Sequence, residues 1–224
     1  MDRAYIKLLS QAKLEGPILV AGFPGVGNVG VMAVRFLIES LQAEKYAELY
    51  SPLLPDHVTV DGDGICSLLK YNFFAADTGG ERHLLILVGD SQPPVEDITA
   101  YYEICGDILD FVENLGCKFI ITLDGFPSLY AQRAIYVAGT SRKVISDYTL
   151  VGARVYDGNR IIGLPGLLLG IAKIRDVRGV CILSPVTDLV SDNEAAFNAY
   201  KFLRKALGLG VGDKNALLGF PSIF

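Results

Sequence analysis

The stretch from Gly16 to Ser40 limits the possible folds of this chain more than any other. Its first part, Pro17 to Ala21, is short and apolar, which is typical of a buried strand. Glycines and a proline interrupt it from Gly22 to Gly25. Asn28 is suited to cap the helix that follows, because its side chain can accept a hydrogen bond from a free amide of the first turn. Apolar residues then recur at helical spacing, at Val31, Val34, Leu37, Ile38 and Leu41. A strand, a glycine turn and a helix in this order usually begin a parallel α/β sheet.

The glycine turn itself has two interpretations. Gly25, Gly27 and Gly30 match the dinucleotide-binding fingerprint, in which glycine lets the backbone approach a pyrophosphate at a helix N-terminus. The acidic residue expected about twenty positions later should end a second strand, yet the glutamates of residues 42–48 follow no long apolar run. A phosphate-binding loop is also disfavoured, since Asn28-Val29 stands where a Lys-Ser/Thr pair is required. The residues favour a tight turn that packs a helix closely against a strand, with nucleotide binding as the alternative.

Composition narrows the class of protein. A length of 224 residues suits one α/β domain, which we place at residues 1–208, followed by a tail at 209–224. A mean hydropathy of +0.37 fits a sheet buried on both faces or a subunit with apolar surface to cover. The net charge of −5 argues against a nucleic-acid partner. The apolar run from Ile161 to Ala172 is too short to cross a membrane.

The N-terminus and the cysteines indicate a cytoplasmic protein. Residues 1–7 lack the basic-then-apolar order of a signal peptide. Cys66, Cys105, Cys117 and Cys181 lie far apart in apolar contexts, which predicts reduced thiols in the core. Because they form no CxxC pair, we expect no metal site. We also expect no cofactor.

The remainder of the chain alternates between strand and helix patterns. Predicted strands cover residues 57–60, 65–74, 82–89, 119–123, 134–138, 151–156, 160–162 and 180–183. Turn residues at 61–64 and 157–159 predict hairpins. Predicted helices cover residues 95–115, 163–173 and 192–207. The helix at 95–115 carries six acidic residues and no basic one, which is typical of a solvated face, with an acidic docking surface as the alternative.

Two aspartates follow predicted parallel strands. Asp90 and Asp124 come after residues 82–89 and 119–123, at the sheet edge where ligands gather in open α/β folds. Strand-end aspartates also cap turns and helices, so both readings stay open. No G-x-S-x-G elbow or other nucleophile motif is present, and we name no catalytic residue. The candidate ligand-binding set is Gly25, Gly27, Asn28, Gly30, Asp90 and Asp124.

Four segments taken together resemble one known family. They are G-F-P-G-V-G-N-V-G at 22–30, L-I-L-V-G-D-S-Q-P at 85–93, L-G-C-K-F-I-I-T-L-D-G at 115–125 and I-G-L-P-G-L-L-L-G at 162–170. In order and spacing they are similar to the PAC2 family, which includes archaeal and eukaryotic proteasome assembly chaperones. The resemblance covers about residues 16–208. It implies a phosphorylase/hydrolase-like, three-layer α/β/α fold with a mostly parallel central sheet.

The resemblance also implies a function. Archaeal relatives are homo-oligomers that engage the α-ring of the proteasome core particle through C-terminal tails. Some family members have been labelled ATP-grasp ligases, a label that this sequence does not support, since it lacks both a phosphate-loop lysine and an ordered set of metal-binding carboxylates.

The C-terminal tail fits this comparison in part. Residues 208–215 are glycine-rich and polar, as in a flexible linker, and the segment after them is apolar. Proteasome activators end in a hydrophobic residue, a tyrosine and any residue, from which Ser222-Ile223-Phe224 departs. The terminal carboxylate remains able to dock in a basic pocket; alternatively, Phe220 and Phe224 pack on the same oligomer. The candidate partner-binding residues are Leu217, Leu218, Phe220, Ile223 and Phe224.

These observations lead to one hypothesis and two alternatives. The first is a non-enzymatic homo-oligomer that assists proteasome assembly by binding α-subunits, without a nucleic-acid or membrane partner. The second is a nucleotide- or nucleoside-binding protein or enzyme that uses the glycine turn and the strand-end aspartates. The third is a structural oligomer with another partner.

Overall fold

A nine-stranded sheet organises the fold, in the order β1-β3-β6-β7-β2-β8-β11-β9-β10. The computed structural model describes residues 1–78, 83–130 and 134–209. The four central strands run parallel: β7 (His83–Gly89), β2 (Ile18–Gly22), β8 (Phe119–Pro127) and β11 (Arg178–Val186). The flanking strands are β1 (Tyr5–Leu8), β3 (Glu44–Tyr50), β6 (Tyr71–Asp77), β9 (Tyr136–Gly139) and β10 (Arg154–Val155). Antiparallel pairing joins β6 to β7 on one side and β9 to β11 on the other.

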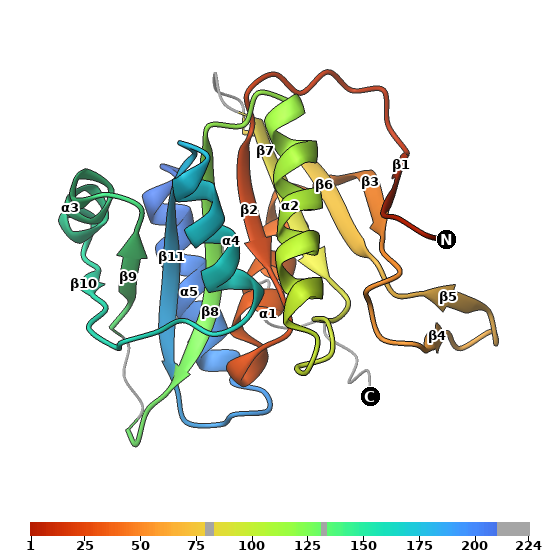
Figure 1. The fold of residues 1–224 in the computed structure, drawn as a ribbon. Helices are drawn as coiled ribbons and strands as arrows, with labels where there is room; N and C mark the ends of the chain where they lie inside the picture. Colours follow the sequence, from red (N-terminus) through yellow and green to blue (C-terminus); the bar gives the residue numbers. More distant parts are fainter. Residues whose placement is uncertain (79–82, 131–133, 210–224) are drawn as a thin grey trace.

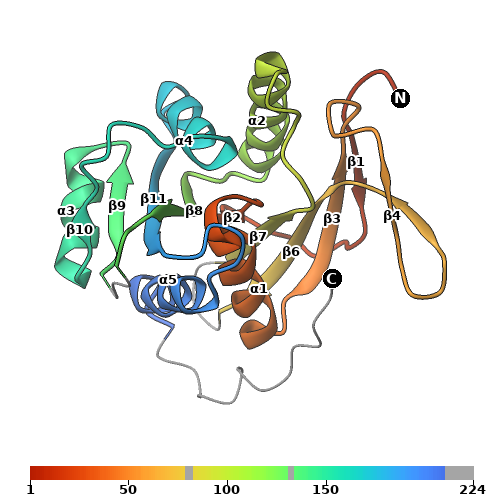
Figure 2. The same ribbon diagram turned by 90° about the horizontal axis from the view of Figure 1, so that it is seen from below.

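Helices cover both faces of this sheet, which confirms the predicted three-layer α/β/α fold (Figure 2). One face carries α1 (Val29–Leu41) and α5 (Asn193–Ala206), and the other carries α2 (Ile98–Asn114) and α4 (Leu164–Ile174). A fifth helix, α3 (Arg142–Val151), lies beside β9 at the edge. The parallel centre agrees with the prediction, while the antiparallel strands are confined to the flanks.

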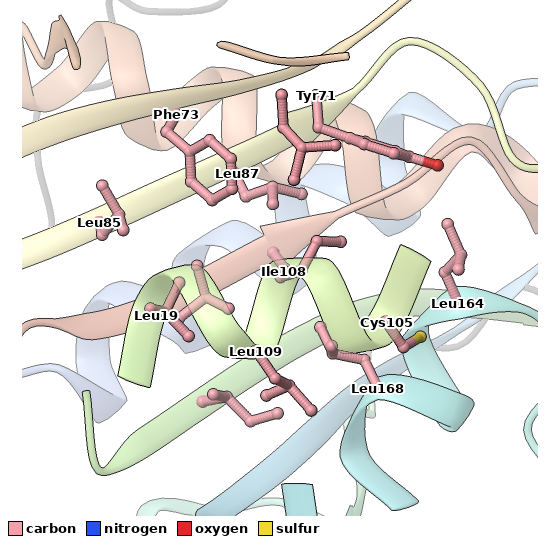
Figure 3. Packing of buried hydrophobic residues seen from close by; sticks show 14 of the residues in the cluster. Leu19, Tyr71, Phe73, Leu85, Leu87, Cys105, Ile108, Leu109, Leu164 and Leu168 are labelled. Carbon is pink, nitrogen blue, oxygen red and sulfur yellow. The ribbon is translucent and has the colours of Figure 1, made fainter. Parts of the chain in front are cut away.

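The core consists of two apolar layers because β2 is buried on both faces. Leu19 belongs to the layer under α2 and α4, and Val20 belongs to the layer under α1 and α5. Successive side chains of a strand point to opposite faces, so a strand between two helix layers must be apolar at every position. Figure 3 shows the first layer, in which Leu109 of α2 and Leu168 of α4 lie over the sheet.

The glycine turn brings α1 unusually close to the sheet. A Cβ atom on Gly30 would lie 2.5 Å from the carbonyl oxygen of Leu123 in β8. A Cβ atom on Gly22 would lie 2.2 Å from the carbonyl oxygen of Gly30. Between these glycines, a 3₁₀ turn, η1 (Val26–Asn28), leads into the helix. The interpretation of this segment as a tight turn with close helix–strand packing therefore fits the geometry.

Asn28 occupies the N-cap position but does not cap the helix as predicted. Its backbone is left-handed, with φ of 50°, and its side chain makes no capping hydrogen bond. Asn is suited to this position for another reason, namely that it tolerates the left-handed conformation better than most residues.

Replacing Gly30 with Ala should destabilise the fold by about 3 kcal/mol, because the added methyl group meets backbone that cannot rotate away. Gly170 is the matched control, since it lies inside α4 with open space at its Cβ position. Gly170→Ala should stabilise the protein by about 0.5–1 kcal/mol through helix propensity. Urea denaturation measures both. Equal effects of the two substitutions would contradict the close-packing account.

The second half of the chain differs from the prediction at three places. Residues 142–151 form α3, which was not predicted, and the strand expected at 151–156 is reduced to β10. Ser141 caps α3 by accepting a hydrogen bond from the Val144 amide at 3.3 Å, and Gly152 ends it with φ of 115°. Residues 157–162 contain neither the predicted hairpin nor the strand at 160–162, and instead form the irregular approach to α4.

The hairpin predicted around residues 61–64 is present, outside the main sheet. Strands β4 (Val58–Val60) and β5 (Cys66–Leu68) pair antiparallel and project from the domain (Figure 1). The Asp61 carboxylate closes the turn by accepting hydrogen bonds from the amides of Asp63 and Ile65. Cys66 is exposed here, so the prediction of a core thiol is wrong for this residue and correct for the other three cysteines.

Candidate functional site

The carboxyl ends of β2, β7 and β8 meet at one edge of the sheet, and a pocket of about 690 Å³ opens there between α2 and α4. The glycine turn, the loop after β7, the end of β8 and the approach to α4 all contribute to its walls. Its lining comprises Gly25, Val26, Gln92, Val95, Ile98, Tyr101, Tyr102, Asp124, Ile161, Ile162, Gly163, Gly166, Leu167 and Gly170. A mostly apolar pocket of this size with a few polar groups has the form of a small-molecule site.

Asp124 is the acidic group of this pocket. Its side chain is only 6% exposed, and one oxygen, Oδ1, accepts a hydrogen bond from the Gly125 amide at 2.8 Å. Burial raises the pKa of this carboxyl to about 7, against the opposing effect of the Gly125 hydrogen bond. Asp124 therefore exchanges a proton near neutral pH, which an exposed aspartate does not do.

Gln92 joins the two glycine-containing turns beside Asp124. Its Nε2 donates a hydrogen bond to the carbonyl oxygen of Pro24, and its Oε1 accepts one from the Leu164 amide at 3.0 Å. The second bond satisfies a free amide at the N-terminus of α4, where Gly163 supplies no side-chain cap. A Cβ atom on Gly163 would lie 2.5 Å from Gln92 Oε1, so glycine is required for this approach. Sequence reasoning did not identify Gln92 as a site residue.

The predicted glycine residues separate in space. Gly25 lines the pocket, and a Cβ atom there would lie 2.9 Å from Asp124 Oδ1. The amide of Gly27 instead donates to the carbonyl of Leu189, and the amide of Asn28 donates to that of Gly25. Gly30 is buried against β8. Two of the amides that would hold a phosphate in a dinucleotide site are thus engaged by protein carbonyls.

Asp90 does not face the same pocket as Asp124. Its carboxylate accepts hydrogen bonds from the amide of Lys70 at 3.1 Å and from the side chain of Asn72 at 3.3 Å, which fastens the start of β6 to the end of β7. Glu48, from the segment where a dinucleotide site would have its acid, lies on β3 and pairs with Lys45 and Lys70. Hydrogen bonds from these lysines overcome burial and lower the pKa of Glu48 to about 2.

Other kinds of site have less support in the part of the chain that the structure describes. His83 begins β7, at the opposite end of that strand from the pocket, and His57 precedes the projecting hairpin. Among the described residues, no three His, Cys, Asp or Glu side chains gather as a metal site would need. None of the helices in residues 1–78, 83–130 and 134–209 has the length and apolar character to span a bilayer. The tail residues Leu217, Leu218, Phe220, Ile223 and Phe224 lie outside the described residues.

The comparison with known families covers most of the chain. The model of the PAC2 family matches residues 19–218. The chain belongs to the PAC2 family. The four segments by which the sequence resembles PAC2 proteins meet at the pocket, since Gly25, Gln92, Asp124 and Gly163 each come from a different one.

Solved structures of PAC2-like proteins share this fold. PbaB of Pyrococcus furiosus, described as an archaeal proteasome activator, is 32% identical and aligns over 95% of this chain and 92% of its own with a TM-score of 0.89. PbaA of the same organism, described as an archaeal homolog of proteasome-assembly chaperone, is 24% identical and aligns over 96% of this chain and 90% of its own, with a TM-score of 0.78.

A sequence relative extends the comparison. An uncharacterized protein of Methanocaldococcus jannaschii is 27% identical over 82% of this chain and 70% of its own.

The raised pKa of Asp124 gives a test of the pocket's electrostatics. Its pKa in the folded protein, about 7, exceeds its ordinary value of 3.8. Protonation of Asp124 therefore contributes its full stabilisation below pH 3.8, where the carboxyl is protonated in both the folded and the unfolded protein. This contribution is lost as the pH rises from 3.8 to about 7, because only the folded protein still holds the proton there. The loss should be roughly 1.4 kcal/mol per pH unit within this window. Asp124→Asn should remove this contribution. The stability of the variant relative to that of the wild type should therefore rise between pH 4 and pH 7.

Chemical denaturation of both proteins at several pH values measures the difference. Asp157→Asn, at an exposed position before α4, is the control and should follow the wild type. A difference between Asp124→Asn and the wild type that stays constant from pH 4 to 7 would show that Asp124 titrates as an ordinary carboxyl.

Proposed function

We propose that this PAC2 protein is a cytoplasmic, non-enzymatic homo-oligomer that binds proteasome α-subunits and acts in proteasome assembly or activation. The observation that carries the proposal is the likeness to PbaB, which extends over nearly the full length of both chains at 32% identity. PbaB is described as a proteasome activator and PbaA as a homolog of an assembly chaperone, so both roles are in scope.

The geometry of the glycine turn supports a role other than nucleotide chemistry. Gly22 and Gly30 serve backbone packing, and the amides of Gly27 and Asn28 are bonded to protein carbonyls. The sequence contains no recognised motif that would pair a nucleophile with a base. These features favour a role in proteasome assembly or activation that is carried by surfaces that meet other polypeptides.

The C-terminal tail is the proposed contact with the α-ring. Residues 208–215 form a glycine-rich linker in sequence, and residues 216–224 are apolar and end in Phe224. Several identical tails on one oligomer raise the effective concentration of each for its site, so weak single contacts add up to useful affinity. The terminal carboxylate would dock in a basic pocket between α-subunits.

Deleting residues 217–224 should weaken binding to the proteasome core particle at least tenfold, because both the apolar tip and its carboxylate are removed. Surface plasmon resonance on immobilised core particle measures the change. Lys214→Ala in the linker is the control and should bind like the wild type. Size-exclusion chromatography should show the same oligomer for all three proteins, and unchanged binding by the truncated form would refute the tail contact.

The same material separates the two proposed roles. An activator should increase peptide hydrolysis by preformed core particle, whereas an assembly chaperone should speed the formation of rings from separate α-subunits. Absence of both effects, together with absence of binding, would leave the likeness to PbaB as one of fold alone.

Self-association has a suitable surface on the projecting hairpin. Val58 and Val60 of β4 pair with Leu68 and Cys66 of β5, so one face of the hairpin is wholly apolar. Val60 is 61% exposed and Leu68 is 55% exposed. A two-stranded hairpin is marginally stable alone in water, so covering this face stabilises it.

Charge favours a second copy of this chain as the occupant of this face. The turn of the hairpin carries Asp61 and Asp63. A hollow of about 430 Å³ beside the apolar face is lined by Lys7 of β1 together with Cys66 and Leu68. In the proposed oligomer, the acidic turn of one copy would meet the basic side chain of Lys7 in the next.

Val60→Asp should reduce the mass of the oligomer, because it places a charge on the apolar face without changing a buried residue. Thr59→Asp is the matched control, since Thr59 lies on the opposite face of the same strand. Light scattering after size-exclusion chromatography measures the mass at a fixed concentration. Equal masses for the two variants would exclude the hairpin from the interface.

A further inference from the structure

The geometry points to the pocket between α2 and α4 as a binding site for a small apolar amine, whose ammonium group pairs with Asp124. This site is independent of proteasome binding. It uses a part of the molecule that the proposed function leaves without a role, namely the pocket, its buried carboxylate and the two acidic residues just before α2.

The size and walls of the pocket suit a compact apolar body. Its volume of about 690 Å³ lies within the range of small-ligand pockets. Val95, Ile98 and Tyr101 form the wall on the α2 side. Ile161 and Leu167 belong to the wall on the α4 side, which is also apolar. Such walls stabilise a ring or a branched chain by removing its surface from water.

Among the residues that the structure describes, Asp124 has no basic partner of the kind that a buried carboxylate normally has. Buried charges in proteins are usually paired or fully hydrogen-bonded. Within the described residues, the carboxyl of Asp124 accepts one hydrogen bond, from the amide of Gly125, and no basic side chain pairs with it. Burial therefore raises its pKa without an opposite charge to offset the effect. An ammonium group supplies both the opposite charge and up to three hydrogen-bond donors.

Glycine keeps the approach to Asp124 open. A Cβ atom on Gly25 would lie 2.9 Å from Asp124 Oδ1 and 3.8 Å from Gln92 Nε2. Because glycine has no Cβ atom, this position stays open for a hydrogen-bond donor of a ligand. Gly163 and Gly166 line the same pocket from the α4 side. The carboxylate is thus deeply placed yet reachable from the pocket.

The charge around the pocket selects a cation over an anion. Glu96 and Asp97, just before α2, lie between the lining residues Val95 and Ile98. Asp110 and Glu113, at the far end of α2, are paired with Arg175. Arg160 in the adjoining loop is exposed and does not line the pocket. Glu96 and Asp97 therefore supply a negative potential that attracts cations toward Asp124.

A pair of probes of the same shape and opposite charge tests the assignment. Phenethylamine and 3-phenylpropionate both carry a phenyl ring on a short chain, and at pH 8 one is a cation and the other an anion. Saturation-transfer NMR on the full chain should detect phenethylamine, and isothermal titration should show at least tenfold tighter binding than for 3-phenylpropionate. Tryptamine and isoamylamine extend the test to other apolar shapes.

Variants then locate the site. Asp124→Asn should lower the affinity for phenethylamine at least tenfold, and Gly25→Ala should do the same by filling the space before Asp124. Glu103→Gln, which removes a charge of α2 outside the pocket lining, should change the affinity less than threefold. Circular dichroism verifies that each variant is folded.

Three results would overturn the assignment: no binding by any of the three amines at millimolar concentration, equal affinity for 3-phenylpropionate, or unchanged amine binding in both Asp124→Asn and Gly25→Ala. The probe comparison uses the wild-type chain alone, so it decides the question even where a variant does not fold.

Discussion

The approach of α1 to the sheet is the contact on which the rest of the structure depends. Gly30 lies against the carbonyl of Leu123, and Gly22 lies against the carbonyl of Gly30. These are contacts between backbone atoms, so neither side can yield by changing a rotamer. They fix how closely α1 packs against the ends of β2 and β8. Gly25 and Val26 are thereby held over the end of β8, where the carbonyl of Val26 leaves no room for a side chain on Gly125.

Much of the fold was predictable from the sequence because its central elements have strong apolar patterns. The buried strands β2, β7, β8 and β11 and the helices α1, α2, α4 and α5 were all anticipated, with shifted ends. Helix α3 was missed because Val144 is its only fully buried residue, which leaves no apolar stripe to read. Residues 160–162 were mistaken for a strand because Ile161 and Ile162 are apolar, yet these two side chains line the pocket.

The candidate site was less predictable, because it depends on contacts between distant parts of the chain. Gly25 and Asp124 were identified and do line one pocket, while Asp90 and Gly27 turn toward other partners. Gln92 was missed because a single glutamine after a strand carries no recognisable pattern. Its two partners are 68 and 72 positions away, and only the folded sheet brings them within reach. Resemblance to the PAC2 family identified the four segments that build the pocket. It did not indicate which contacts each of their residues makes there.

The position of β2 at the centre of the sheet has a consequence for biosynthesis. Ile18 lies opposite Leu84 on one side and Phe119 on the other. By contrast, β3, β6 and β7 are consecutive strands of the main sheet and pair with one another in that order. During translation these three strands can associate early, whereas β2 is made before them and gains its second neighbour only after residue 119 has left the ribosome. A very apolar strand therefore spends this interval half covered, when encounters with other nascent chains are most hazardous.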